Sequence, residues 1–91
     1  MAQPEAPQRT LIRSTKLAPV AARLDALAAL GDRKGVETEA PHWLQPDTYL
    51  EPFALRALGI VREESALVER AAARFDAMGL GWHSAQTRAS L

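Results

Sequence analysis

The chain has 91 residues, with eleven basic and eleven acidic side chains and no cysteine. This length suits a single domain with a thin core. The balanced charge creates no overall field that would attract nucleic acid or anionic lipid, and the lack of cysteine excludes disulfides and thiolate metal sites. No apolar run approaches the roughly 18–20 residues of a membrane span, and residues 1–16 lack the apolar stretch of a secretory signal. We therefore expect a soluble, cytoplasmic protein.

Alanine is abundant, aromatic residues make up 5% of the chain, and no segment alternates apolar and polar residues as a half-buried strand does. The composition predicts an all-α fold of about five helices. Residues 1–16 contain two prolines, two glutamines and three basic residues, and we expect them to form a flexible basic arm. Residues 17–91 would then form the helical domain.

The first two helices have local start and stop signals. The first is predicted from about Ala18 to Leu30, because Pro19 suits a first helical turn and Gly31 can adopt the left-handed conformation that ends a helix. Asp32 can cap a second helix that runs to about Ala40. Pro41 must then end or kink this helix.

The third helix, from about Pro52 to Arg62, is apolar on nearly every side, which predicts a position between neighbouring helices. Its start is open: Thr48 and Glu51 have the form of a capping box, whereas a start at Glu51 places the proline first. Gly59 costs about 1 kcal/mol in a helix interior. We expect the close approach of another helix to compensate, with Ala71 as its contact.

Ser65 is a good N-cap for a fourth helix over residues 66–78, which Gly79 would end. A fifth helix follows over residues 82–90. Its predicted inward residues are Trp82, Ala85 and Ala89. This helix has no hairpin partner in the chain, so we expect self-association through the terminal helices.

The chain contains an internal repeat. Residues 26–31 and 54–59 agree at five of six positions. A second alignment superposes the turns of the two predicted hairpins instead, and it matches Gly31 and Asp32 with the turn after Val61. Either alignment gives helical hairpins with a period near 30–35 residues. The second hairpin contains four residues whose positions relative to one another resemble the tetratricopeptide repeat signature: Leu58, Gly59, Ala71 and Phe75. The resemblance implies a short right-handed stack of antiparallel hairpins.

The sequence of residues 24–88 resembles the C-terminal repeat regions of bacterial signalling ATPases, for example in the segments LDALAALGD and YLEPFALRALGIVRE. These include adenylate/guanylate cyclase-like proteins and LuxR-type regulators. By that resemblance the chain is a protein–protein interaction (scaffold) module in a bacterial regulatory system. A peptide partner would lie along the groove of the first helices of the hairpins, where Phe53, Arg56 and Ile60 are the expected contacts.

We identify no catalytic, cofactor-binding or metal-binding motif, and we expect no enzyme activity. Ser65, His83 and Asp76 have the chemistry of a triad but no nucleophile-elbow or oxyanion motif. His42 and His83 each adjoin a tryptophan and lack metal-ligand spacing. The alternative function is a small helical DNA-binding or antitoxin-like regulator that uses the basic arm, and its DNA affinity would fall steeply with salt.

Overall fold

The computed structural model describes the backbone of residues 5–91 and the side chains of residues 17–91. This part of the chain consists of helices and turns without any strand, so the all-α prediction is confirmed for it. The elements in chain order are α1 (Glu5–Ala29), α2 (Arg33–Glu39), the 3-10 turn η1 (Ala40–Trp43), α3 (Glu51–Arg62), α4 (Ser65–Ala77) and α5 (Gly81–Arg88). No helix within the described part combines the length and apolar character needed to cross a bilayer.

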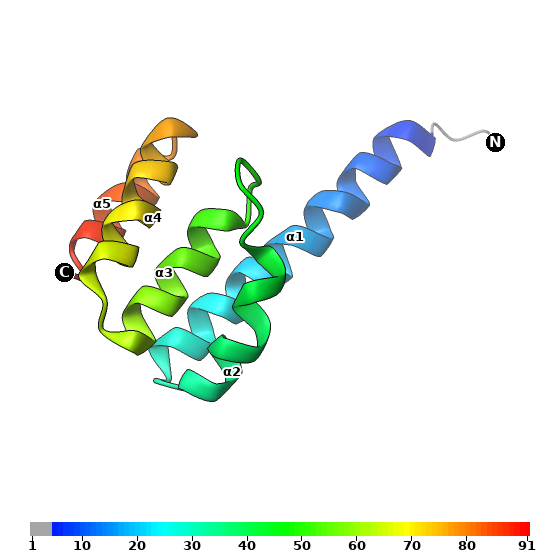
Figure 1. The fold of residues 1–91 in the computed structure, drawn as a ribbon. Helices are drawn as coiled ribbons and strands as arrows, with labels where there is room; N and C mark the ends of the chain where they lie inside the picture. The colour runs from blue at the N-terminus through cyan, green and yellow to red at the C-terminus, as the bar shows by residue number, and fades with distance from the viewer. Residues whose placement is uncertain (1–4) are drawn as a thin grey trace.

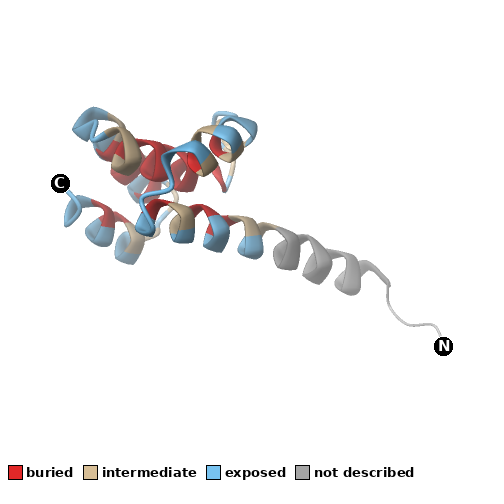
Figure 2. Cartoon of the chain, turned by 90° about the horizontal axis from the view of Figure 1, so that it is seen from below, coloured by how far each residue is buried: buried red, intermediate tan, exposed pale blue. Residues whose placement is uncertain are grey.

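Helix α3 lies at the centre of the molecule. It packs against α1, α2 and η1 on one side and against α4 on the other (Figure 1). Every residue from Glu51 to Gly59 is buried, which Figure 2 shows as the red segment inside the fold. The prediction that this helix lies between neighbours is therefore confirmed. Its apolar side chains supply much of the single core.

Several helix ends follow the local signals. The side chain of Asp32 caps α2 by accepting a hydrogen bond from the backbone N–H of Gly35, at 2.9 Å. Gly79 adopts a positive φ of 75° after α4, where a side chain would be strained. Helix α3 begins at Glu51 with its proline in the first turn, which decides the start that the sequence left open.

Helix α1 begins at Glu5 and not near Ala18. Pro19 lies inside it, where it removes one intrahelical hydrogen bond without ending the helix. The expected flexible arm, residues 1–16, falls on positions whose side chains lie outside the described residues, and its flexibility stays a prediction.

The turn between α3 and α4 is shorter than predicted. Glu63 ends α3 in the left-handed conformation, with φ of 56°, and the N–H of Glu64 bonds to the carbonyl of Gly59 at 2.9 Å. Glu64 becomes the N-cap residue through its extended backbone, and its side chain makes no capping hydrogen bond. The prediction of Ser65 as N-cap is wrong, because Ser65 is already the first residue of α4.

Gly59 allows α4 to approach α3 closely, as predicted, but the contact differs. A Cβ atom on Gly59 would lie 2.6 Å from Cγ2 of Val68 and 3.1 Å from Cβ of Leu67. Ala71, the expected contact, is fully buried one helical turn further along α4. The closest approach therefore comes near the start of α4, next to the tight turn.

Helix α5 turns a different face inward from the one predicted. Ser84 and Thr87 are buried, whereas Trp82 is 67% exposed and Ala85 and Ala89 are exposed. These buried polar side chains form hydrogen bonds within the fold, which compensates for the loss of water. The hydroxyl of Thr87 donates to the carbonyl of His83 at 2.6 Å and accepts from Arg56 at 3.0 Å.

Candidate functional site

Three helices are tied together by one buried arginine. The guanidinium of Arg56 on α3 donates to both carboxylate oxygens of Asp25 on α1, at 2.9 and 3.0 Å, and to the hydroxyl of Thr87 on α5, at 3.0 Å. Each partner is separated from Arg56 by 31 residues, one before it and one after it. Positions 31 residues apart on α1, α3 and α5 therefore meet at one place in the fold.

The side chain of Arg56 is enclosed by aromatic rings. The residue is 7% exposed, and its guanidinium carbon lies 5.0 Å from the centre of the Phe75 ring and 5.4 Å from that of Phe53. Both contacts are within the range of a cation–π interaction. Asp25 is the more accessible partner, with 44% of its side chain exposed. The two-pronged ion pair fixes the spacing of α1 and α3.

A hollow of about 300 Å³ opens beside this ion pair. All its residues come from α1, α3 and the C-terminal end of the chain, at or after α5: Asp25, Ala28, Ala29, Arg56, Ile60, Gln86 and Ser90. The alanine and serine residues contribute only small side chains to this surface.

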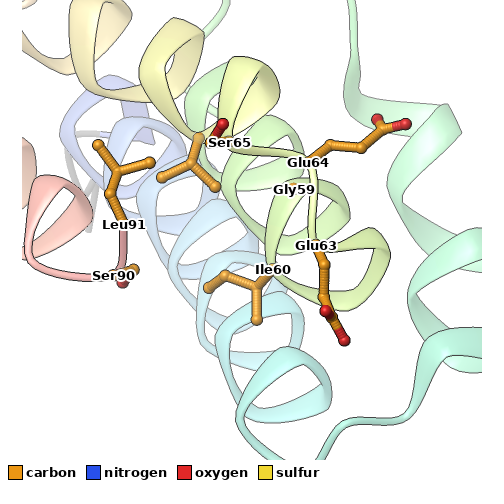
Figure 3. A pocket seen from close by; sticks show the side chains of 8 residues that line it. Gly59, Ile60, Glu63, Glu64, Ser65, Ser90 and Leu91 are labelled. Atoms are coloured by element: carbon orange, nitrogen blue, oxygen red, sulfur yellow. The ribbon is translucent and has the colours of Figure 1, made fainter.

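A second hollow, of about 320 Å³, adjoins the first and shares Ile60 and Ser90 with it. It lies between the α3–α4 turn and the C-terminal residues, and Figure 3 shows the Ile60 side chain pointing toward Ser90 and Leu91. Glu63 and Glu64 lie at its rim with their carboxylates directed outward. We refer to the two hollows together as the groove.

The groove has an acidic rim. Asp25 is neutralised by Arg56, but no described Arg or Lys lies within ion-pair distance of Glu63 or Glu64. The left-handed backbone of Glu63 costs about 1 kcal/mol for a residue with a side chain. The α3–α4 turn therefore carries two unpaired negative charges at the edge of the hollow that Ile60 and Leu91 line, with both carboxylates directed outward.

The three residues expected in the groove lie in two different environments. Arg56 and Ile60 both line the groove, whereas Phe53 is 2% exposed and lies in the core. The four repeat positions, Leu58, Gly59, Ala71 and Phe75, are all buried. Sequence reasoning missed Asp25 and Thr87, although their spacing of 31 residues from Arg56 was available as a signal.

His83 lies in an aromatic cluster next to the arginine. Its ring stacks on Phe75 at 5.1 Å between centres and meets the edge of Phe53 at 5.2 Å, and its Nδ1 is buried without a hydrogen-bond partner. Burial lowers the pKa of His83 below 6.5, the positive charge of Arg56 lowers it further, and Asp25 opposes both. The neutral ring is therefore the form that the fold accommodates.

This environment predicts a loss of stability in mild acid. The unfolded chain takes up the His83 proton near pH 6.5 while the folded chain resists it. Stability is therefore full above that pH, falls as the pH drops from 6.5 to the lower, folded pKa, and levels off below it. Thermal melts between about pH 7.5 and 5 should show a falling midpoint. His83→Phe should keep the stacking and remove most of this decline.

The exposed His42 supplies the control, since His42→Gln should leave the decline as it is in the wild type. The carboxylates of Glu37, Glu39 and Asp76 have pKa values lowered by arginine and other hydrogen-bond partners, so they titrate below this range. An unchanged melting midpoint over the range in the wild type would contradict the prediction.

The described residues offer little catalytic chemistry. No three His, Asp or Glu side chains within residues 17–91 gather closely enough to hold a metal. Asp76 pairs with Arg88 at 3.0 Å, and Nδ1 of His83 has no hydrogen-bond partner, so the triad of Ser65, His83 and Asp76 is not assembled. The groove presents small and apolar side chains flanked by charge.

Comparison of the chain with protein-family models, with curated proteins and with solved structures found no match. The groove and the buried ion pair are therefore the basis on which a function can be argued.

Proposed function

We propose that this chain is a protein–protein interaction module whose groove binds a peptide segment of a partner. The observation that carries the proposal is the lining of the groove by residues of α1, α3 and the C-terminal end of the chain, which meet around the Asp25–Arg56 pair. Inner helices that stack side by side would give an extended peptide contacts from one helix after another. The Asp25–Arg56 ion pair would also preorganise these contacts, which lowers the entropy cost of binding a peptide.

The proposal includes a repeat architecture of the tetratricopeptide kind. In this reading α1 and α2 form the first hairpin, α3 and α4 the second, and α5 the first helix of a third. The spacing of 31 residues between Asp25, Arg56 and Thr87 supports it, and so does the close packing of Gly59 against α4. A scaffold role in a cytoplasmic bacterial regulatory system, as the family resemblance implies, completes the proposal.

A selection from a random peptide library displayed on phage tests the groove directly. Peptides that bind the wild-type chain should lose about tenfold or more in affinity for Ala29→Arg, equal to about 1.4 kcal/mol, because the new side chain would fill the groove. Ala73→Arg is the matched control: it places the same side chain at an exposed position on α4, outside the groove. Titration calorimetry with the selected peptides measures both.

The proposal fails if the selection yields no binder, or if all selected peptides bind Ala29→Arg and the wild type equally. Circular dichroism spectra and melting midpoints of the two variants should match the wild type, because both substitutions replace an exposed alanine by arginine, a good helix former. Any loss of affinity can then be assigned to the groove.

A further inference from the structure

The charges of this chain are divided unevenly along its length. Residues 1–16 contain three basic residues and one acidic residue, whereas residues 17–91 contain eight basic and ten acidic residues. The basic residues Arg9, Arg13 and Lys16 follow one another at intervals of four and three, which is the spacing of one face of a helix. Leu11 and Ile12 lie among them. This segment has the opposite charge to the rim of the groove.

The described part of the chain already pairs most of its own charges. Arginines at positions 23, 33, 56, 62, 74 and 88 all have carboxylate partners. Glu63 and Glu64 have no such partner among residues 17–91, and they lie at the edge of the hollow that Ile60 and Leu91 line. A ligand with both positive charge and aliphatic side chains would match this combination.

The first residues of α1 cannot reach the groove of their own molecule. Helix α1 is continuous from Glu5 to Ala29, and Ala29 lines the groove. Residue 9 therefore lies about 30 Å away along the helix axis, at about 1.5 Å per residue. Figure 1 shows the start of α1 and the C-terminus at opposite ends of the molecule. Contact between the basic segment and the groove requires two molecules.

We propose that the groove of one copy binds the basic segment, residues 9–16, of a second copy. The proposal rests on the proposed function, because it assigns an occupant to the same groove. Arg9, Arg13 and Lys16 would face Glu63 and Glu64, while Ile12 would meet the apolar surface of Ile60 and Leu91. Each copy would use its segment at one end and its groove at the other, so the contact is head-to-tail and gives a ring or an extending chain.

A charge-reversal experiment on the full-length chain tests this pairing. Sedimentation equilibrium should show that the mass of the wild type rises with concentration and that the association weakens in about 1 M salt, where the Debye length is about 3 Å. Glu63→Lys/Glu64→Lys and Arg9→Glu/Arg13→Glu should each weaken association by about tenfold or more. The chain that combines all four substitutions should associate again.

Glu69→Lys is the control, because Glu69 is exposed on α4 outside the groove and its reversal should leave association unchanged. A labelled synthetic peptide of residues 5–16 supplies a second measurement. Its fluorescence anisotropy should rise with wild-type chain and should not rise with Glu63→Lys/Glu64→Lys. Circular dichroism of every variant should show wild-type helix content, since the altered residues of the groove are exposed.

The inference is overturned if the wild type stays monomeric at high concentration, if the two reversals do not restore association when combined, or if the peptide binds both chains equally. It is also overturned if mixed-sequence duplex DNA binds through Arg9 and Arg13 while the chain remains monomeric, which would assign the basic segment to nucleic acid. Selected phage peptides that bind the groove while residues 5–16 do not would leave the proposed function standing and reject this occupant.

Discussion

Gly59→Leu is expected to lower the free energy of unfolding by more than about 2 kcal/mol. Even the first added atom is obstructed, since a Cβ on Gly59 would lie 2.6 Å from Cγ2 of Val68 and 2.9 Å from its backbone nitrogen. The side chain of Val68 can rotate, but its backbone is fixed in α4 by the tight turn. Relief of the contact would separate α3 from α4, which together hold much of the core. Urea unfolding followed by circular dichroism measures the change.

Gly59→Ala makes the test more specific, because alanine is favoured over glycine by about 1 kcal/mol in a helix interior. We expect the obstruction at Val68 to outweigh that gain, so that alanine also destabilises the fold. Gly81→Ala is the matched control, since a Cβ at the start of α5 would meet no atom within 4 Å. A Gly59→Ala chain as stable as the wild type would contradict the close approach.

Asp25→Ala is expected to cost about 2 kcal/mol, because it leaves the guanidinium of Arg56 nearly buried without its carboxylate. The figure is below the range for fully buried pairs, since Asp25 is 44% exposed and Arg56 keeps its contacts with Thr87 and two aromatic rings. Arg56→Met should cost less, about 1 kcal/mol, because an exposed aspartate can be hydrated and methionine keeps much of the apolar contact.

The double variant Asp25→Ala/Arg56→Met should be more stable than the sum of the single effects predicts, by about 1 kcal/mol. Urea unfolding of the wild type, both single variants and the double variant gives this coupling energy. Arg88→Met removes a partner from a half-exposed pair with Asp76 and should have a smaller effect than Asp25→Ala. Strictly additive effects would show that the pair does not hold α1 against α3.

Local signals in the sequence predicted most of the helix ends. Asp32 caps α2, and Gly31 and Gly79 adopt a positive φ after α1 and α4. These signals work because a cap or a left-handed residue acts on backbone groups within a few positions of itself. The start of α1 is an exception. Pro19 suits a first helical turn, but α1 continues through it with the loss of one intrahelical hydrogen bond.

The burial of α3 was also predictable, because a helix that is apolar on nearly every side must be covered on every side. The orientation of helix α5 could not be predicted in this way. Its apolar residues, Trp82 and Ala85, are exposed, while Ser84 and Thr87 are buried. A short helix with few apolar residues has no dominant stripe, so its orientation is decided by the hydrogen bonds that its neighbours offer.

The sequence by itself determined that this chain is helical, where most of its helices end, and that Gly59 packs against another helix. Those properties depend on backbone geometry and on the spacing of apolar side chains along one segment. Only the tertiary structure decided that Arg56 is buried between Asp25 and Thr87 and that Ile60 lines a groove with an acidic rim. Such contacts join residues 31 positions apart, and they depend on how the helices pack and not on any signal within one helix.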